Sequence, residues 1–117
     1  MNMTTETRVD GKIQILMKIT DDLIQFYGNV HGGVIAGLMD SCIAVAINQE
    51  LTPEEGASTV EMKLNYLRSV NQGTLRGEGK VIKKGRNIIV GQGEIKDEED
   101  NLVAFGTGTF IITELTR

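Results

Sequence analysis

One stretch of the sequence combines a glycine turn with an isolated carboxylate, and this combination suits chemistry at a carbonyl group. His31, Gly32 and Gly33 precede a long apolar segment, in which Asp40 is the only charged residue before Glu50. The first turn of a helix exposes N–H groups without partners, whose partial positive charge suits an anion or an oxygen that gains charge during attack. A carboxylate on a buried helix is costly unless it is paired or used. The pattern predicts an anion site and a reactive Asp40; the alternative is an Asp that faces a solvated groove or caps a loop.

The spacing of these residues predicts that the site needs two copies of the helix. His31 and Asp40 are nine positions apart, which places them about 13 Å apart along a helix axis and on opposite faces. One helix can hardly bring both to a single small group, whereas two antiparallel helices can exchange their turns and carboxylates. We therefore expect an active site shared between two subunits of a symmetric dimer.

The periodicity of the apolar residues predicts an α+β domain built on one helix. Val34–Glu50 is apolar on every side, which is typical of a buried helix. From Ser58 onward apolar and polar residues alternate, which is the pattern of half-buried strands. Strands are expected at Arg8–Thr20, from Ser58 to Tyr66, and at Gly73–Lys83, Asn87–Lys96 and Leu102–Thr113. A curved antiparallel sheet of about five strands would wrap around one long buried helix in a single domain, residues 1–117.

Three pairs of glycines, each two positions apart, lie within the expected strands: Gly77 and Gly79, Gly91 and Gly93, Gly106 and Gly108. Residues i and i+2 of a strand point to one face of the sheet. Glycine weakens a strand, so repeated pairs indicate close approach or strong curvature. We expect the sheet to curl closely around the helix at these pairs; the alternative is that they mark β-bulges.

Composition excludes several classes of function. The 117 residues carry a net charge of -4, which argues against general nucleic-acid binding. No apolar stretch reaches the ~18–20 residues of a membrane span, and no signal peptide is visible at Met1–Asp10, so we expect a cytoplasmic protein without a membrane partner. With one His and one Cys, no metal site is expected. Cys42 lies in an apolar run and is expected to be a small buried hydrophobe, not a nucleophile.

The segment Gln25–Asp40, with its Asp nine residues after the His of His-Gly-Gly, resembles the hot-dog thioesterases of the phenylacetate-pathway (PaaI-like) type. The likeness extends over nearly the whole chain, because Ala57–Ser69 and Leu102–Thr109 are similar to the family's second and last strands. It implies the hot-dog fold and hydrolysis of an acyl-CoA thioester to a free acid and CoA. Coenzyme A would be part of the substrate, with no separate cofactor, and the subunits would assemble as a dimer or a dimer of dimers.

The resemblance also implies roles for residues of the turn and the helix. The Gly32 N–H would hold the thioester oxygen, with Gly33 beside it in substrate binding. Asp40 of the partner subunit would attack the carbonyl or act as the base for a water molecule. His31 would mainly hold the turn in shape. Gln25 falls where the family carries an Asn or Gln that contacts the reacting group; the alternative is an ordinary solvated loop residue.

Two further positions match substrate-binding positions of the family. Thr59 matches a hydroxyl that orients the water in some relatives, although strand propensity alone would also explain a threonine there. The cluster Lys83-Lys84-Gly85-Arg86 resembles the loop that meets the phosphates of CoA, for which cations and N–H groups are suited. The alternative is a solvated hairpin turn. Outside the glycine turn, the predicted substrate-binding residues are therefore Thr59, Lys84, Gly85 and Arg86.

The sequence departs from the family at its start, and other functions stay open. Many relatives begin with a helix that helps to cover the acyl end of the site, whereas only about eight residues precede the first expected strand here. The acyl length and the packing of subunit pairs therefore stay open. A non-catalytic acyl-CoA-binding protein is the main alternative, although it would not need Asp40. A hot-dog dehydratase is a third, but those enzymes use a His and a carboxylate at other spacings.

Overall fold

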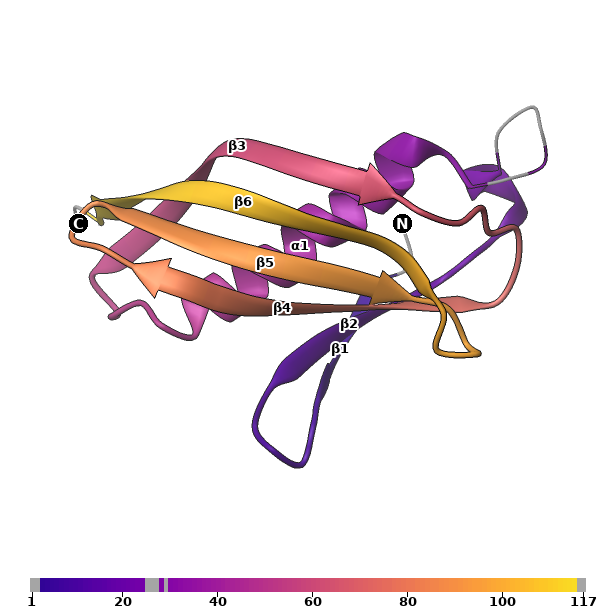
Figure 1. The fold of residues 1–117 in the computed structure, drawn as a ribbon. Coiled ribbons are helices and arrows are strands. Elements are labelled where there is room, and N and C mark those ends of the chain that lie inside the picture. The colour runs from indigo at the N-terminus through magenta and orange to yellow at the C-terminus, as the bar shows by residue number, and fades with distance from the viewer. Residues whose placement is uncertain (1–2, 25–27, 29, 116–117) are drawn as a thin grey trace.

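The protein folds into a curved sheet with one long helix packed against its concave side (Figure 1). The computed structural model describes residues 3–24, 28 and 30–115. The strands form one antiparallel sheet in the order β1-β2-β4-β5-β6-β3, so β1 and β3 are its edges. In chain order the elements are β1 (Met3–Thr7), β2 (Ile13–Lys18), the 3-10 turn η1 (Asp21–Leu23), α1 (Gly32–Asn48), β3 (Glu55–Tyr66), β4 (Thr74–Lys84), β5 (Ile88–Lys96) and β6 (Leu102–Glu114).

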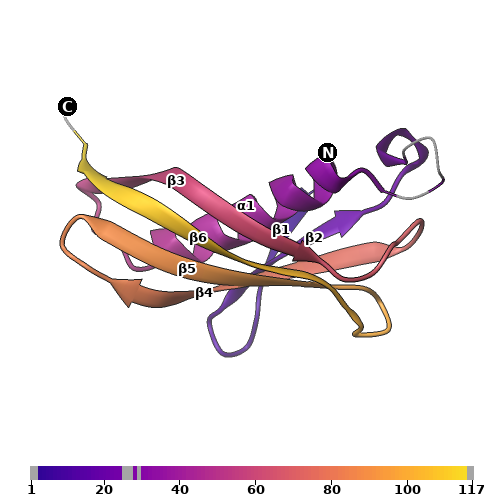
Figure 2. The same cartoon turned by 45° about the horizontal axis from the view of Figure 1, so that its top comes forward.

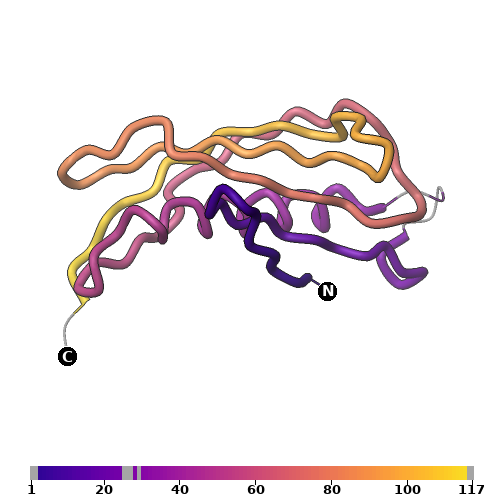
Figure 3. Tube along the Cα trace, turned by 90° about the horizontal axis from the view of Figure 1, so that it is seen from below, coloured from indigo at the N-terminus to yellow at the C-terminus, as the bar shows by residue number. Residues whose placement is uncertain are grey.

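The sheet and α1 form two layers, which are separate when the chain is viewed along the plane of the sheet (Figure 3). In the turned view the edge strand β3 runs alongside α1 (Figure 2). The core lies between the layers, and each aliphatic side chain buried there contributes about 1.5–3 kcal/mol. From α1 it contains Ile35, Leu38, Met39, Cys42, Ile43, Ala46 and Ile47, and from the sheet Met17, Leu75, Ile89, Ile95 and Val103 among others.

The helix begins earlier and is less enclosed than the sequence predicted. It begins at Gly32, two residues before the expected start, so the glycine turn is the first turn of α1 and His31 is its N-cap. Val34, Ala44 and Val45 are only half-buried, because the sheet covers one face of the helix and no other described element covers the opposite face. Within the described ranges, no helix is long and apolar enough to cross a membrane.

The sheet has six strands, where the sequence predicted about five. The expected strand Arg8–Thr20 is a hairpin turn followed by β2, and β1 pairs with β2 ahead of it. The turn is closed by the Arg8 N–H, which donates to Lys12 O at 2.7 Å, and Gly11 has a φ of 86°. The apolar alternation that marks a half-buried strand is absent from β1, because its side chains are mostly exposed, so the pattern did not predict this strand.

Two of the three glycine pairs allow the sheet to approach α1 closely, as expected. A Cβ at Gly79 would lie 2.3 Å from the Cys42 carbonyl oxygen, and one at Gly93 would lie 2.6 Å from Met39 Sδ. The third pair has a different role, because a Cβ at Gly106 would lie 2.6 Å from the Lys63 carbonyl oxygen of β3. None of these glycines is the extra residue at a register shift of the sheet, although one shift, at Val81/Lys83, borders the pairing of Val81 with Gly91. The glycines therefore serve close packing and not bulges.

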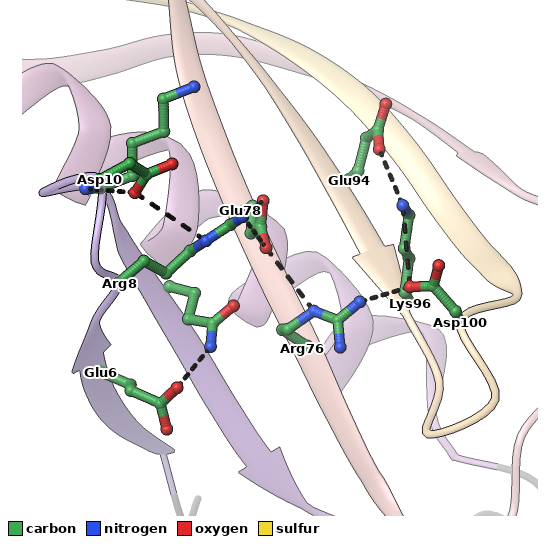
Figure 4. A network of polar contacts seen from close by, with 10 residues as sticks. Glu6, Arg8, Asp10, Arg76, Glu78, Glu94, Lys96 and Asp100 are labelled. Atoms are coloured by element: carbon green, nitrogen blue, oxygen red, sulfur yellow. Dashed lines mark hydrogen bonds and ion pairs between the residues drawn. The ribbon is translucent and has the colours of Figure 1, made fainter.

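Ion pairs on the outer face of the sheet fasten the β1–β2 hairpin to β4 (Figure 4). Arg8, in the hairpin turn, donates to both carboxylate oxygens of Glu78 at 2.9 and 2.8 Å. Arg76 also lies near Glu78, and it bonds to Asp100 in the β5–β6 turn. The N-terminal hairpin is thus held by charge as well as by strand pairing, on the face opposite α1.

Candidate active site

The main chain of His31 shapes the start of α1. Its N–H donates to Leu23 O at 3.1 Å, and its carbonyl oxygen accepts from the N–H groups of Val34 and Ile35 at 3.0 and 3.3 Å. The imidazole makes no capping hydrogen bond, and the residue is exposed. In the described part of the chain, His31 therefore acts on the turn through its backbone.

Gly32 and Gly33 leave the backbone of the first helical turn open. A Cβ at Gly33 would meet no atom within 4 Å, and one at Gly32 would make only ordinary contacts of 3.7 Å with the Tyr66 ring. Neither glycine has a positive φ. The chain itself therefore does not require glycine at these positions. Both residues are exposed, and their N–H groups have no acceptor within the helix.

Tyr66, the last residue of β3, contacts this turn and was not predicted as a site residue. Its hydroxyl donates to Gly32 O at 3.1 Å, and the end of β3 lies beside the beginning of α1 (Figure 1). Tyr66 is 55% exposed, although it follows Met62 and Leu64 at the apolar positions of the alternating pattern. Only that high exposure sets Tyr66 apart, and exposure is not visible in the sequence.

Asp40 lies on α1 and is joined to Thr59 of β3. Thr59 Oγ1 donates to Asp40 Oδ1 at 3.0 Å, and Asp40 itself is half-buried. Thr59 stands at a β-bulge, because the register between β3 and β6 shifts between Thr59 and Glu61. The structure thus brings together two of the predicted site residues, on the side of the helix that faces the free edge of the sheet.

The same chain does not bring Asp40 to its own glycine turn. Gly32 and Asp40 both belong to α1, eight positions apart, which corresponds to about 12 Å along the axis. A single carbonyl group cannot contact both.

The predicted basic loop lies at the other end of α1. Lys84 Nζ donates to Glu50 O at 2.8 Å and to Glu55 Oε1 at 3.3 Å, so its charge is already engaged. The pKa of Glu55 is lowered because its carboxylate accepts hydrogen bonds from the Thr52 N–H and from Lys84. The Gly85 N–H donates to Ile88 O at 2.8 Å and closes the β4–β5 turn, while Arg86 is exposed.

Two other expectations concern residues outside this arrangement. Gln25 lies outside the described residues. Cys42 is 1% exposed, and burial raises the pKa of its thiol to about 12, which confirms its interpretation as a buried hydrophobe. Among the described residues no group of three or more His, Cys, Asp or Glu side chains is placed to hold a metal ion.

A groove of about 310 Å³ runs beside the glycine turn. Its walls come from the start of α1 and from the end of β3 with the loop that follows. Their lining combines apolar side chains with polar groups and one cation: Val30, Gly32, Ile35, Tyr66, Leu67, Arg68, Ser69 and Val70. The groove therefore suits an apolar group whose polar end reaches the first turn of α1.

Comparison with known proteins places this site in a family context. The sequence profile described as thioesterase superfamily matches residues 27–104, a range that contains the glycine turn, Asp40 and Thr59. Among relatives in sequence, the 1,4-dihydroxy-2-naphthoyl-CoA hydrolase of Listeria monocytogenes is 24% identical over 102 residues, covering 87% of this chain and 83% of that protein.

Two solved structures superpose closely on this one. The thioesterase HI1161 of Haemophilus influenzae has a TM-score of 0.91 and 25% identity, with 98% of this chain and 80% of that chain covered. The BH2602 protein of Bacillus halodurans, crystallised with CoA, has a TM-score of 0.91 and 26% identity, with 97% and 75% covered. The expected resemblance to hot-dog thioesterases is thereby confirmed.

Proposed function

The chain belongs to the thioesterase superfamily, which makes thioester hydrolysis its general reaction, and on this premise we propose that its substrate is an acyl-CoA. Two similarities support this substrate class: the Bacillus halodurans protein was crystallised with CoA, and the Listeria relative is named as the hydrolase of a CoA ester. The products would be the free acid and CoA.

The observation that carries the proposed hydrolysis by Asp40 is the hydrogen bond that the Thr59 hydroxyl donates to its carboxylate. It holds one carboxylate oxygen in place, and no group of the described residues forms a hydrogen bond with the other. A carboxylate held in this way can accept a proton from water or attack a carbonyl carbon itself. Asp40 is only half-buried and lies near the sheet edge, so a substrate would approach that second oxygen from this edge.

The reaction then follows one of two balanced routes. As a base, Asp40 takes a proton while the water oxygen bonds to the thioester carbon, and the carbonyl oxygen becomes negative against the Gly32 N–H. Cleavage of the C–S bond expels the CoA thiolate, which takes up the proton. As a nucleophile, Asp40 displaces CoA to form an anhydride, which water hydrolyses. Both routes need a donor at the oxygen and a free Asp40 oxygen.

The site is proposed to be completed by a second copy of the chain. The carboxylate and the turn of one copy are about 12 Å apart along α1, so the partner's turn would face Asp40. β3 offers the means, since it is a 12-residue edge strand with Val60 60% exposed at its bulge. Long exposed edges favour pairing with another chain. The mass in solution distinguishes such a dimer from a dimer of dimers.

The β4–β5 turn is proposed to meet the phosphates of CoA. Arg86 is the exposed cation of this turn, whereas Lys84 is already bonded to Glu50 and Glu55. We therefore expect Arg86 to contribute more to phosphate binding than Lys84. Gly85 lies between them in the turn that would meet the phosphates.

Free-thiol release from short, medium, long and aryl acyl-CoAs tests the proposal, with the wild type beside Asp40→Asn. Asparagine can still accept the Thr59 hydrogen bond, so the fold is kept while the base or nucleophile is lost. We expect turnover to fall at least ~100-fold, and Glu94→Gln, an exposed carboxylate of β5, to keep wild-type turnover. Binding of acyl-CoA without any turnover would instead favour the non-catalytic binding function.

A further inference from the structure

We propose that Tyr66 positions and polarises the Gly32–Gly33 peptide, so that the Gly33 N–H serves as a second donor to the thioester oxygen. This inference rests on the proposed acyl-CoA hydrolysis. It concerns the orientation and donor strength of the N–H groups at the start of the helix. Tyr66 would be a positioning residue, because it touches the peptide and not the reacting atoms.

The geometry begins with the peptide group itself. The carbonyl oxygen of Gly32 and the N–H of Gly33 belong to one planar amide. In the helix that oxygen accepts a hydrogen bond from the N–H group four residues further along the chain. It also accepts one from the Tyr66 hydroxyl at 3.1 Å. A donor at the oxygen of an amide strengthens the N–H of the same amide as a donor, and it fixes the plane of the group.

The neighbouring peptide is prepared in the same way, but by the main chain. The N–H of Gly32 shares its amide with the carbonyl of His31, which accepts from Val34 and Ile35 at 3.0 and 3.3 Å. Both exposed N–H groups of the first turn therefore belong to amides whose oxygens are engaged twice. Only the second depends on a side chain, so only the second can be changed without altering the helix.

Packing alone does not account for Tyr66. The residue is 55% exposed, and its ring and Gly32 both line the groove beside the turn. Gly33 is exposed, and a Cβ there would meet no atom within 4 Å, so no other side chain crowds this residue. The hydroxyl thus donates its hydrogen bond to a backbone carbonyl at the surface, beside the two N–H groups that the proposed reaction uses.

Tyr66→Phe tests the inference, because it keeps the ring over Gly32 and removes only the donor. We expect kcat on the fastest acyl-CoA of the panel to fall about fivefold with KM changed less than about twofold. Thr113→Val is the matched control. It also removes an exposed hydroxyl that donates to a backbone carbonyl, because Thr113 bonds to Gly56 O at 3.4 Å, away from the turn. This control should leave kcat unchanged.

A spectroscopic measurement separates polarisation from a structural effect. The same acyl-CoA, labelled with ¹³C at the carbonyl, is bound to Asp40→Asn and to the double variant with Tyr66→Phe. We expect the thioester C=O stretch to move back toward its solution frequency in the double variant. An unchanged kcat of Tyr66→Phe together with an unchanged C=O frequency in the double variant would overturn the role of Tyr66 while hydrolysis stands. A lower kcat with a lower Tm of Tyr66→Phe, at an unchanged C=O frequency, would overturn it as well. A wild type without turnover would overturn both proposals.

Discussion

At the scale of single residues, Asp40 and Thr59 form the best-defined contact of the candidate site. Threonine is branched at Cβ and has few rotamers in a strand, so the hydroxyl that donates to Asp40 Oδ1 at 3.0 Å is held by the backbone of β3. The carboxylate is thereby oriented from outside its own helix. Its orientation depends on a residue 19 positions away in sequence.

We expect Thr59→Val to lower kcat about tenfold, because a hydrogen bond to a charged group is worth ~1.5–3 kcal/mol. Thr59→Ser should keep most of the activity, and Thr107→Val, an exposed threonine of β6, should keep all of it. Steady-state kinetics with thermal melts of each variant make the measurement. Equal activity of Thr59→Val and wild type would show that Asp40 does not need this hydroxyl.

The sequence identified some site residues and not others, for physical reasons. An isolated Asp40 in an apolar helix and the glycines at its start are unusual in composition, and this can be seen without a structure. Tyr66 follows the alternation of an ordinary strand, so its bond to Gly32 depends on where β3 ends relative to α1. The engagement of Lys84 by Glu50 and Glu55 is likewise a tertiary contact that a basic cluster does not reveal.

At the scale of elements, the contact between α1 and the middle strands is set by glycines. Gly79 and Gly93 face the helix where a methyl group would overlap Cys42 or Met39. The glycines of the first helical turn are different, since Gly33 has free space around it. The same residue type therefore serves packing in the sheet and access at the turn.

This difference predicts opposite results for one substitution at two places. Gly79→Ala should lower the free energy of unfolding by about 3 kcal/mol, because its methyl group would overlap backbone. Gly33→Ala should keep or raise stability by up to ~1 kcal/mol, since alanine favours helix, yet lower kcat, because the methyl group would stand where the substrate approaches. Urea unfolding and thiol release measure both. A Gly33→Ala enzyme of full activity would contradict the assignment of the turn.

The elements show where sequence patterns suffice. The long helix and the four strands from β3 to β6 follow from periodicity, and their ends shift by a few residues at most. The β1–β2 hairpin does not follow from periodicity, because β1 is exposed along most of its length and few of its side chains are buried. The Asp10-Gly11 pair in its turn is the one local signal that indicates a hairpin there.

At the scale of the whole molecule, two surfaces are incomplete in the described chain. β3 ends the sheet with an unpaired edge, and the outer face of α1 keeps Val34, Ala44 and Val45 half-exposed. Asp40 lies between them, bonded to β3. A second copy that covered this side would bury apolar surface and bring its own glycine turn toward Asp40, which is the arrangement proposed for the active site.

Subunit mixing tests the shared site directly. Asp40→Asn and Gly33→Leu should each be inactive alone, because one lacks the carboxylate and the other blocks the turn. If each site takes its turn from one subunit and its carboxylate from the other, unfolding and refolding an equal mixture should restore about a quarter of wild-type activity, from one intact site in each mixed dimer. Mixtures that stay inactive, although mass measurements detect mixed dimers, would place both groups of each site in one chain.

The strand order also has a consequence for biosynthesis. β3 is third in the sequence, but within the described chain it pairs only with β6, the last of the six strands. While the chain emerges from the ribosome, β3 has to wait until nearly all of the described residues are made, whereas the β1–β2 hairpin can close at once. Thr59 therefore reaches Asp40 among the last events of synthesis. A chain that stops before β6 would present β3 without a partner, and we expect such fragments to be removed by quality control before they acquire any activity.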